Sequence, residues 1–117
     1  MMRIYISGPM TGVPNYKDKF DEAEKYLTDK GYDVFNPARV DDALPVKIMT
    51  YDEIMDIDLC MLRMCDAIYM LNGWCSSKGA WIELMDALAN DLQVYQQLTN
   101  KLVFNANNIP FSAPDVL

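Results

Sequence analysis

Histidine is absent from the sequence. Any acid–base chemistry near neutral pH would therefore depend on carboxylates, tyrosines, lysines or thiols. Runs of eighteen apolar residues are also absent, so we expect no membrane-spanning helix and no membrane partner. The first residues have the pattern of a strand, which predicts that the chain starts without a signal peptide.

Positive charge is scarce. The 117 residues include ten lysines and arginines against 17 aspartates and glutamates, which gives a net charge of −7. A nucleic-acid polymer requires a basic face, so this balance argues against such a partner. A small ligand with one phosphate is still compatible, because backbone N–H groups in a loop can hold it.

Cysteine is also sparse. The three cysteines, Cys60, Cys65 and Cys75, are odd in number and lack the spacing of a metal site. This usage predicts free thiols in a reducing cytoplasm, and we expect neither a metal nor a cofactor. About half of the residues are apolar, which is enough for the core of one domain, residues 1–117.

Short apolar runs bounded by turn residues indicate buried strands. The predicted strands are residues 3–7, 32–35, 67–71 and 92–95, with Leu102-Val103-Phe104 as a further short strand. The loop after the first strand, residues 8–15, contains glycines and precedes a helix, which is a weak indication of an anion site.

Helical patterns separate these strands. Asn15 and Ser77 stand at predicted helix N-caps, and Thr50 begins a capping box with Glu53. Residues 38–49 have the pattern of a loop. The alternating order predicts an α/β protein, a flavodoxin- or Rossmann-like three-layer sandwich with a four- to five-stranded, mainly parallel sheet.

The stretch from Leu71 to Leu84 combines a strand end, a loop and a helix start. Glu83 falls in the first turns of this helix, and its same-face neighbours include Gly79, Ala80 and Ala87. A carboxylate among such small residues has space beside it for a ligand. The alternative is a helix packed closely on its strand, with Glu83 as a solvated surface residue.

Asp58 lies at the centre of the apolar face of its helix, near Ile54, whereas Asp56 lies on the polar side. A charge in that position is costly unless it is paired or used. Asp58 precedes Asp66 by eight residues, about 12 Å of helix, and the following strand rises about 16 Å over five residues. Asp58 and Glu83 should therefore meet at the carboxyl edge of the sheet, where open α/β folds bind ligands. A structural aspartate satisfied by backbone amides is the alternative for Asp58, and Asp66, at the opposite edge, is predicted to be structural.

Together these residues resemble a known family. The matching segments are YISGPMTG at residues 5–12, Asn36-Pro37, Asp58-Leu59, CDAIYML-GW at residues 65–74 and S-GA--E at residues 77–83. They are similar to short bacterial and phage proteins with a domain of unknown function related to nucleoside 2-deoxyribosyltransferases and 2′-deoxynucleoside 5′-phosphate N-hydrolases.

The resemblance implies roles for particular residues. Glu83 would be the nucleophile, Asp58 would position the substrate, and the loop of residues 7–12 would contact the sugar and phosphate. The implied substrate-binding residues are Tyr5, Ser7, Gly8, Pro9, Met10, Asn36, Asn72, Gly73, Trp74, Ser77 and Gly79. The sequence departs from the enzymes at Trp81, where they usually have a glycine, and in its large Trp74.

The implied activity is cleavage or transfer of the N-glycosidic bond of a nucleoside or nucleoside 5′-monophosphate by a homodimer or higher homo-oligomer. Two carboxylates are sufficient for this chemistry, because one can attack or stabilise C1′ and another group can assist the departing base. A position near a helix N-terminus would favour ionised Glu83. A non-catalytic module that binds or sequesters nucleotides, and a structural oligomer with a vestigial site, are the alternatives.

Overall fold

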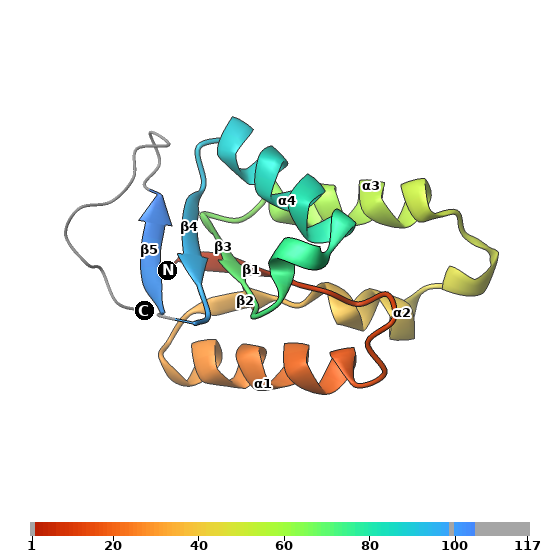
Figure 1. Cartoon of the computed structure of the whole chain (residues 1–117), viewed down its shortest axis with the longest axis horizontal. Coiled ribbons are helices and arrows are strands. Elements are labelled where there is room, and N and C mark those ends of the chain that lie inside the picture. Colours follow the sequence, from red (N-terminus) through yellow and green to blue (C-terminus); the bar gives the residue numbers. More distant parts are fainter. Residues whose placement is uncertain (1, 99, 105–117) are drawn as a thin grey trace.

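A computed structural model describes residues 2–98 and 100–104 and contains one five-stranded sheet with the order β2-β1-β3-β4-β5. The strands are β1 (Arg3–Ser7), β2 (Asp33–Phe35), β3 (Ala67–Met70), β4 (Gln93–Gln96) and β5 (Lys101–Phe104). The first four strands are parallel, and β5 runs antiparallel to β4 (Figure 1). The predicted mainly parallel sheet is thereby confirmed, including the short strand at residues 102–104.

Helices cover both faces of the sheet, as in a three-layer sandwich. Helix α1 (Tyr16–Asp29) lies on one face, and α3 (Tyr51–Leu62) and α4 (Lys78–Ala89) lie on the other (Figure 1). Two separate apolar clusters fill the two interfaces. Residues that contribute to the α1 side include Ile4, Ile6, Phe20, Leu27 and Tyr69. Residues that contribute to the α3 and α4 side include Tyr5, Leu62, Ile68, Met70 and Leu84.

The caps of α3 and α4 form as predicted. The Thr50 side chain accepts a hydrogen bond from the Glu53 backbone N–H at 3.1 Å, and Glu53 accepts one from the Thr50 N–H at 2.8 Å. The Ser77 hydroxyl accepts from the Ala80 N–H at 3.2 Å. Asn15 does precede α1, but its side chain makes no capping hydrogen bond, so the cap expected there is wrong.

Residues 38–49 contain short helices, which corrects their interpretation as a loop. A 3₁₀ turn (Pro37–Arg39) leads into α2 (Val40–Ala43), and a second 3₁₀ turn (Val46–Ile48) precedes α3. The Asn36 side chain caps the first turn by accepting from the Ala38 N–H at 3.0 Å. These turns are too short for a periodic pattern, and they place α2 beside the carboxyl edge of the sheet (Figure 1).

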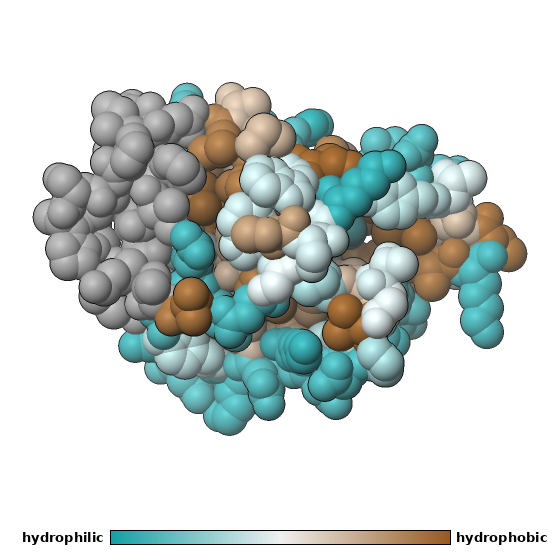
Figure 2. All heavy atoms as spheres, in the orientation of Figure 1, coloured by the Kyte–Doolittle hydropathy of each residue, from teal (hydrophilic) through white to brown (hydrophobic). Residues whose placement is uncertain are grey.

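The connection from α2 to α3 exposes apolar side chains. Ile48 is 84% exposed and Leu44 is 37% exposed, and Figure 2 shows hydrophobic surface at this end of the molecule. None of the helices in the described part of the chain has the length and apolar character needed to cross a membrane.

Candidate active site

Glu83 is buried under the sheet edge and held by β1. The residue is 5% exposed. One carboxylate oxygen, Oε2, accepts a hydrogen bond from the Tyr5 hydroxyl, and Oε1 accepts from Ser7 Oγ at 2.7 Å. Tyr5 and Ser7 are two residues apart on one strand and therefore project from the same face of it. The alternative of a solvated Glu83 is wrong, because α4 turns this carboxylate toward β1.

Asp58 on α3 is also buried, at 7% exposure, whereas Asp56 is exposed as predicted. Its Oδ1 is the one buried side-chain oxygen or nitrogen of the described residues that has no hydrogen-bond partner. The alternative of an aspartate satisfied by backbone amides is therefore not observed at this oxygen. Buried polar atoms are nearly always paired, so an orphaned carboxylate oxygen in a pocket is a candidate contact for a ligand.

Burial raises the pKa of both carboxyl groups to about 7. For Glu83 the main cause is burial, and the hydrogen bonds from Tyr5 and Ser7 act in the opposite direction. For Asp58 the main cause is also burial, and repulsion from the negative charges of Glu83 and Asp41 raises the pKa further. The pKa of Glu83 is thus raised by burial, although a position near a helix N-terminus was expected to favour the ionised form.

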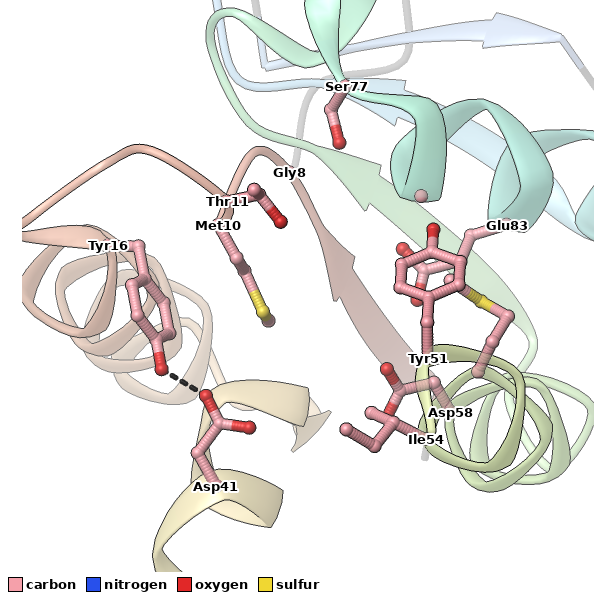
Figure 3. A pocket seen from close by; sticks show the side chains of 12 residues that line it. Gly8, Met10, Thr11, Tyr16, Asp41, Tyr51, Ile54, Asp58, Ser77 and Glu83 are labelled. Atoms are coloured by element: carbon pink, nitrogen blue, oxygen red, sulfur yellow. Dashed lines mark hydrogen bonds between the residues drawn. The ribbon is translucent and has the colours of Figure 1, made fainter. Parts of the chain in front are cut away.

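The two carboxylates open into a cavity of about 280 Å³ at the carboxyl edge of the sheet. It lies between the loop after β1, α2, α3 and the start of α4 (Figure 3). The residues that line it are Gly8, Met10, Thr11, Tyr16, Asp41, Tyr51, Ile54, Met55, Asp58, Ser77, Gly79 and Glu83. Although three of these are acidic, no group of histidine, cysteine, aspartate or glutamate side chains that could hold a metal occurs among the described residues.

Two glycines around this cavity lie close to neighbouring groups. A Cβ at Gly8 would lie 2.8 Å from the Leu71 Cβ, so the loop after β1 could not run this close to the end of β3. A Cβ at Gly79 would lie 3.2 Å from the Tyr51 hydroxyl and would crowd it. The close approach of these backbones shapes the pocket, which agrees with the small residues predicted around Glu83.

The structure brings many of the predicted site residues together. Gly8, Met10, Ser77 and Gly79 line the cavity with Asp58 and Glu83. Tyr5 and Ser7 contact the Glu83 carboxylate from behind. Pro9 lines an adjoining hollow formed with the N-terminus of α4.

The remaining predicted residues do not line the cavity. Asn36 donates hydrogen bonds to Asp21 and Glu24 on α1, at 2.9 and 3.0 Å. Trp74 packs edge-to-face on Trp81, with ring centroids 4.9 Å apart. Asn72 and Gly73 belong to the same loop, where the Asn72 N–H donates to the Gln97 side chain at 2.9 Å. A role for these four residues in binding stays a prediction.

Five residues of the cavity wall were not predicted from the sequence. Tyr51 could have been found, because it lies seven residues before Asp58 and therefore on the same face of α3. Tyr16 is half-buried, packs against the core on the α1 side of the sheet and donates a hydrogen bond to Asp41 in α2. Asp41 had no signal of its own in a segment without periodicity. The other missed residues are Ile54 and Met55, whereas Thr11 belongs to the loop of residues 7–12 that was expected to contact the sugar and phosphate.

The fold and the site define a class: an α/β domain with two buried carboxylates facing a pocket at the carboxyl edge of a parallel sheet. The chain belongs to the family described as a domain of unknown function, DUF4406, which matches residues 2–96. No curated protein matches the sequence.

Three solved structures share the fold. The CMP N-glycosidase BcmB of Clostridium botulinum has 20% identity and a TM-score of 0.55, with 80% of this chain and 66% of that chain covered. The 2-deoxyribosyltransferase of Bacillus psychrosaccharolyticus has 23% identity and a TM-score of 0.61, with 80% and 70% covered. BlsM has 20% identity and a TM-score of 0.63, with 83% and 64% covered. The chain thus spans about two thirds of the length of these proteins.

Proposed function

We propose that this protein cleaves the N-glycosidic bond of a nucleoside or nucleotide, with Glu83 as the nucleophile. The observation that carries the proposal is the buried Glu83 carboxylate, which is held by Tyr5 and Ser7 and shares one pocket with the orphaned oxygen of Asp58. Fixed donors on Glu83 leave its carboxylate in one orientation, which suits attack on a single carbon.

The two carboxyl groups suit a two-step reaction. In the first step a Glu83 oxygen bonds to C1′ while the bond from C1′ to the base nitrogen breaks. The electron pair leaves with the base, which takes the proton from Asp58. In the second step the Asp58 carboxylate takes a proton from water, whose oxygen bonds to C1′ and releases Glu83. A second base in place of water would make the reaction a transfer.

Two of the proteins with the same fold are described as an N-glycosidase and a 2-deoxyribosyltransferase, and both names denote chemistry at this bond. The adjoining hollow supports a nucleoside 5′-monophosphate as substrate, because Ser76, Ser77 and Lys78 meet there at the N-terminus of α4. A monophosphate should therefore bind more tightly than the bare nucleoside.

A nucleotide-binding module without turnover is the second candidate. It is favoured by Trp81, which occupies the position where the enzymes that the sequence resembles have a glycine. Trp81 is 43% exposed, and its indole N–H donates to the Cys75 carbonyl at 2.8 Å, so it fixes the loop before α4. Such a module would be stabilised by nucleotides but would release no base.

Base release from a panel of nucleosides and 5′-monophosphates tests the proposal. Glu83→Gln should lower the rate at least about a thousandfold, because it removes the group that bonds to C1′. Glu22→Gln, the same change on the exposed surface of α1, is the matched control. A 2-fluoro-sugar nucleotide should add the mass of one sugar to a peptide containing Glu83. A Glu83→Gln protein with near wild-type turnover would overturn the enzymatic proposal.

A further inference from the structure

The cavity has a second polar wall, opposite Glu83 and Asp58. The Tyr16 hydroxyl of α1 donates a hydrogen bond to Oδ2 of Asp41 in α2. Figure 3 shows this pair across the pocket from the two buried carboxylates, with the side chains of Met10 and Ile54 between the two walls. A flat ligand between these apolar side chains would reach the buried carboxylates with one end and Asp41 with the other.

Hydroxyl groups of Thr11, Tyr16, Tyr51 and Ser77 line the cavity, but its charged groups are all acidic. Among the lining residues, the charged groups are the carboxylates of Asp41, Asp58 and Glu83, and none has an amide or cationic side chain. Carboxylates that are ionised only accept hydrogen bonds. The end of a ligand that faces Asp41 must therefore offer N–H or O–H groups, since a carbonyl oxygen placed there would meet another acceptor.

Asp41 is not needed merely to connect α1 and α2, because the neighbouring Asp42 already does so. Lys17 and Asp42 form an ion pair of 2.6 Å between the same two helices, one residue further along each. Both of these side chains are largely exposed and lie outside the cavity. In the described residues Tyr16 is the one hydrogen-bond donor to Asp41, and it engages only Oδ2. The other carboxylate oxygen is left to face a ligand.

We propose that Asp41 selects nucleobases that carry an exocyclic amino group, of the cytosine or adenine type, by accepting its N–H. This inference rests on the proposed function, because the sugar at Glu83 places the base edge toward Asp41. Bases with a carbonyl group at the same ring position, of the uracil or hypoxanthine type, would be disfavoured. The hydrogen bond from Tyr16 fixes the carboxylate so that Oδ1 faces the base.

The test compares the dissociation constants of paired ligands: cytidine and uridine 5′-monophosphates, and adenosine and inosine 5′-monophosphates. Calorimetry on the full chain in the Glu83→Gln background keeps the ligands intact. At least one amino ligand should bind at least about tenfold more tightly than its carbonyl partner, because the latter leaves two acceptors facing each other. In Asp41→Asn the amide oxygen can accept from Tyr16 and the amide N–H₂ can face the base, so the preference should disappear or reverse.

Asp42→Asn is the matched control, since it removes the same charge one residue away and outside the cavity. It should leave the preference unchanged. Equal binding of amino and carbonyl ligands, no binding of any amino ligand, or an equal change in Asp42→Asn would each overturn the role of Asp41. Base release by the protein with wild-type Glu83 is measured separately. Selective binding without base release would refute the proposed chemistry and keep the selectivity, whereas base release without selectivity would do the opposite.

Discussion

The two ends of the parallel sheet hold aspartates in opposite conditions, although both belong to the α3–β3 unit. At the amino end, Asp66 is exposed and accepts a hydrogen bond from the Arg3 backbone N–H at 2.9 Å. At the carboxyl end, Asp58 is 7% exposed and its Oδ1 has no partner among the described residues. The first arrangement joins two strands at little cost, whereas the second costs free energy of folding. A buried carboxylate that lowers the stability of the fold is a candidate catalytic group.

Exchange of each aspartate for asparagine should affect base release very differently at the two ends. Asp58→Asn should lower base release at least about a hundredfold, because the amide can neither give a proton to the base nor take one from water. Asp66→Asn keeps an oxygen that accepts from Arg3 and should stay within about threefold of wild type. Initial rates under saturating nucleotide, with melting temperatures as a check on folding, measure both. If the two variants lost activity equally, the distinction between the two ends would be wrong.

The two buried carboxyl groups should make the stability of the protein depend on pH. The folded pKa of both Asp58 and Glu83 is raised to about 7, from about 4 in an unfolded chain. The folded state therefore binds more protons between these values. The contribution of these extra protons to the free energy of unfolding is fully present below pH about 4 and is lost as the pH rises through about 7.

Between pH 5 and pH 8 the free energy of unfolding should thus fall by about 5 kcal/mol. Asp58→Asn should make this slope shallower and should stabilise the protein above pH 7, because it removes a buried charge. Urea unfolding of the wild-type protein and of Asp58→Asn at several pH values measures both effects. A stability that rises with pH through this window would contradict the assigned shifts.

The sequence predicts the sheet and the common location of Asp58 and Glu83, but not the whole pocket. Long amphipathic helices and apolar strands have periodic patterns, and the spacing from Asp58 to Asp66 places the carboxylate at the correct edge. Asp41 belongs to a four-residue helix, whose position depends on contacts between distant segments. The loop with Trp74 turns at Gly73, which has a φ of +85°, and Trp74 packs on Trp81 outside the cavity. Such orientations depend on the tertiary structure and have no sequence period.

A smaller change is expected in the pKa of Glu83 when a residue of β1 is replaced. Ser7 Oγ donates to this carboxylate at 2.7 Å and thereby lowers a pKa that burial raises. Ser7→Ala removes this donor, so the pKa of Glu83 should rise further, by up to about one unit. The acid limb of the pH profile of base release should move to higher pH by the same amount, since the nucleophile must be ionised. Carbon-detected NMR titration of the Glu83 carboxyl measures the shift without depending on turnover. Ser76→Ala, outside the contact with Glu83, is the control and should leave the titration in place. An unchanged Glu83 titration in Ser7→Ala would mean that this hydrogen bond does not tune the nucleophile.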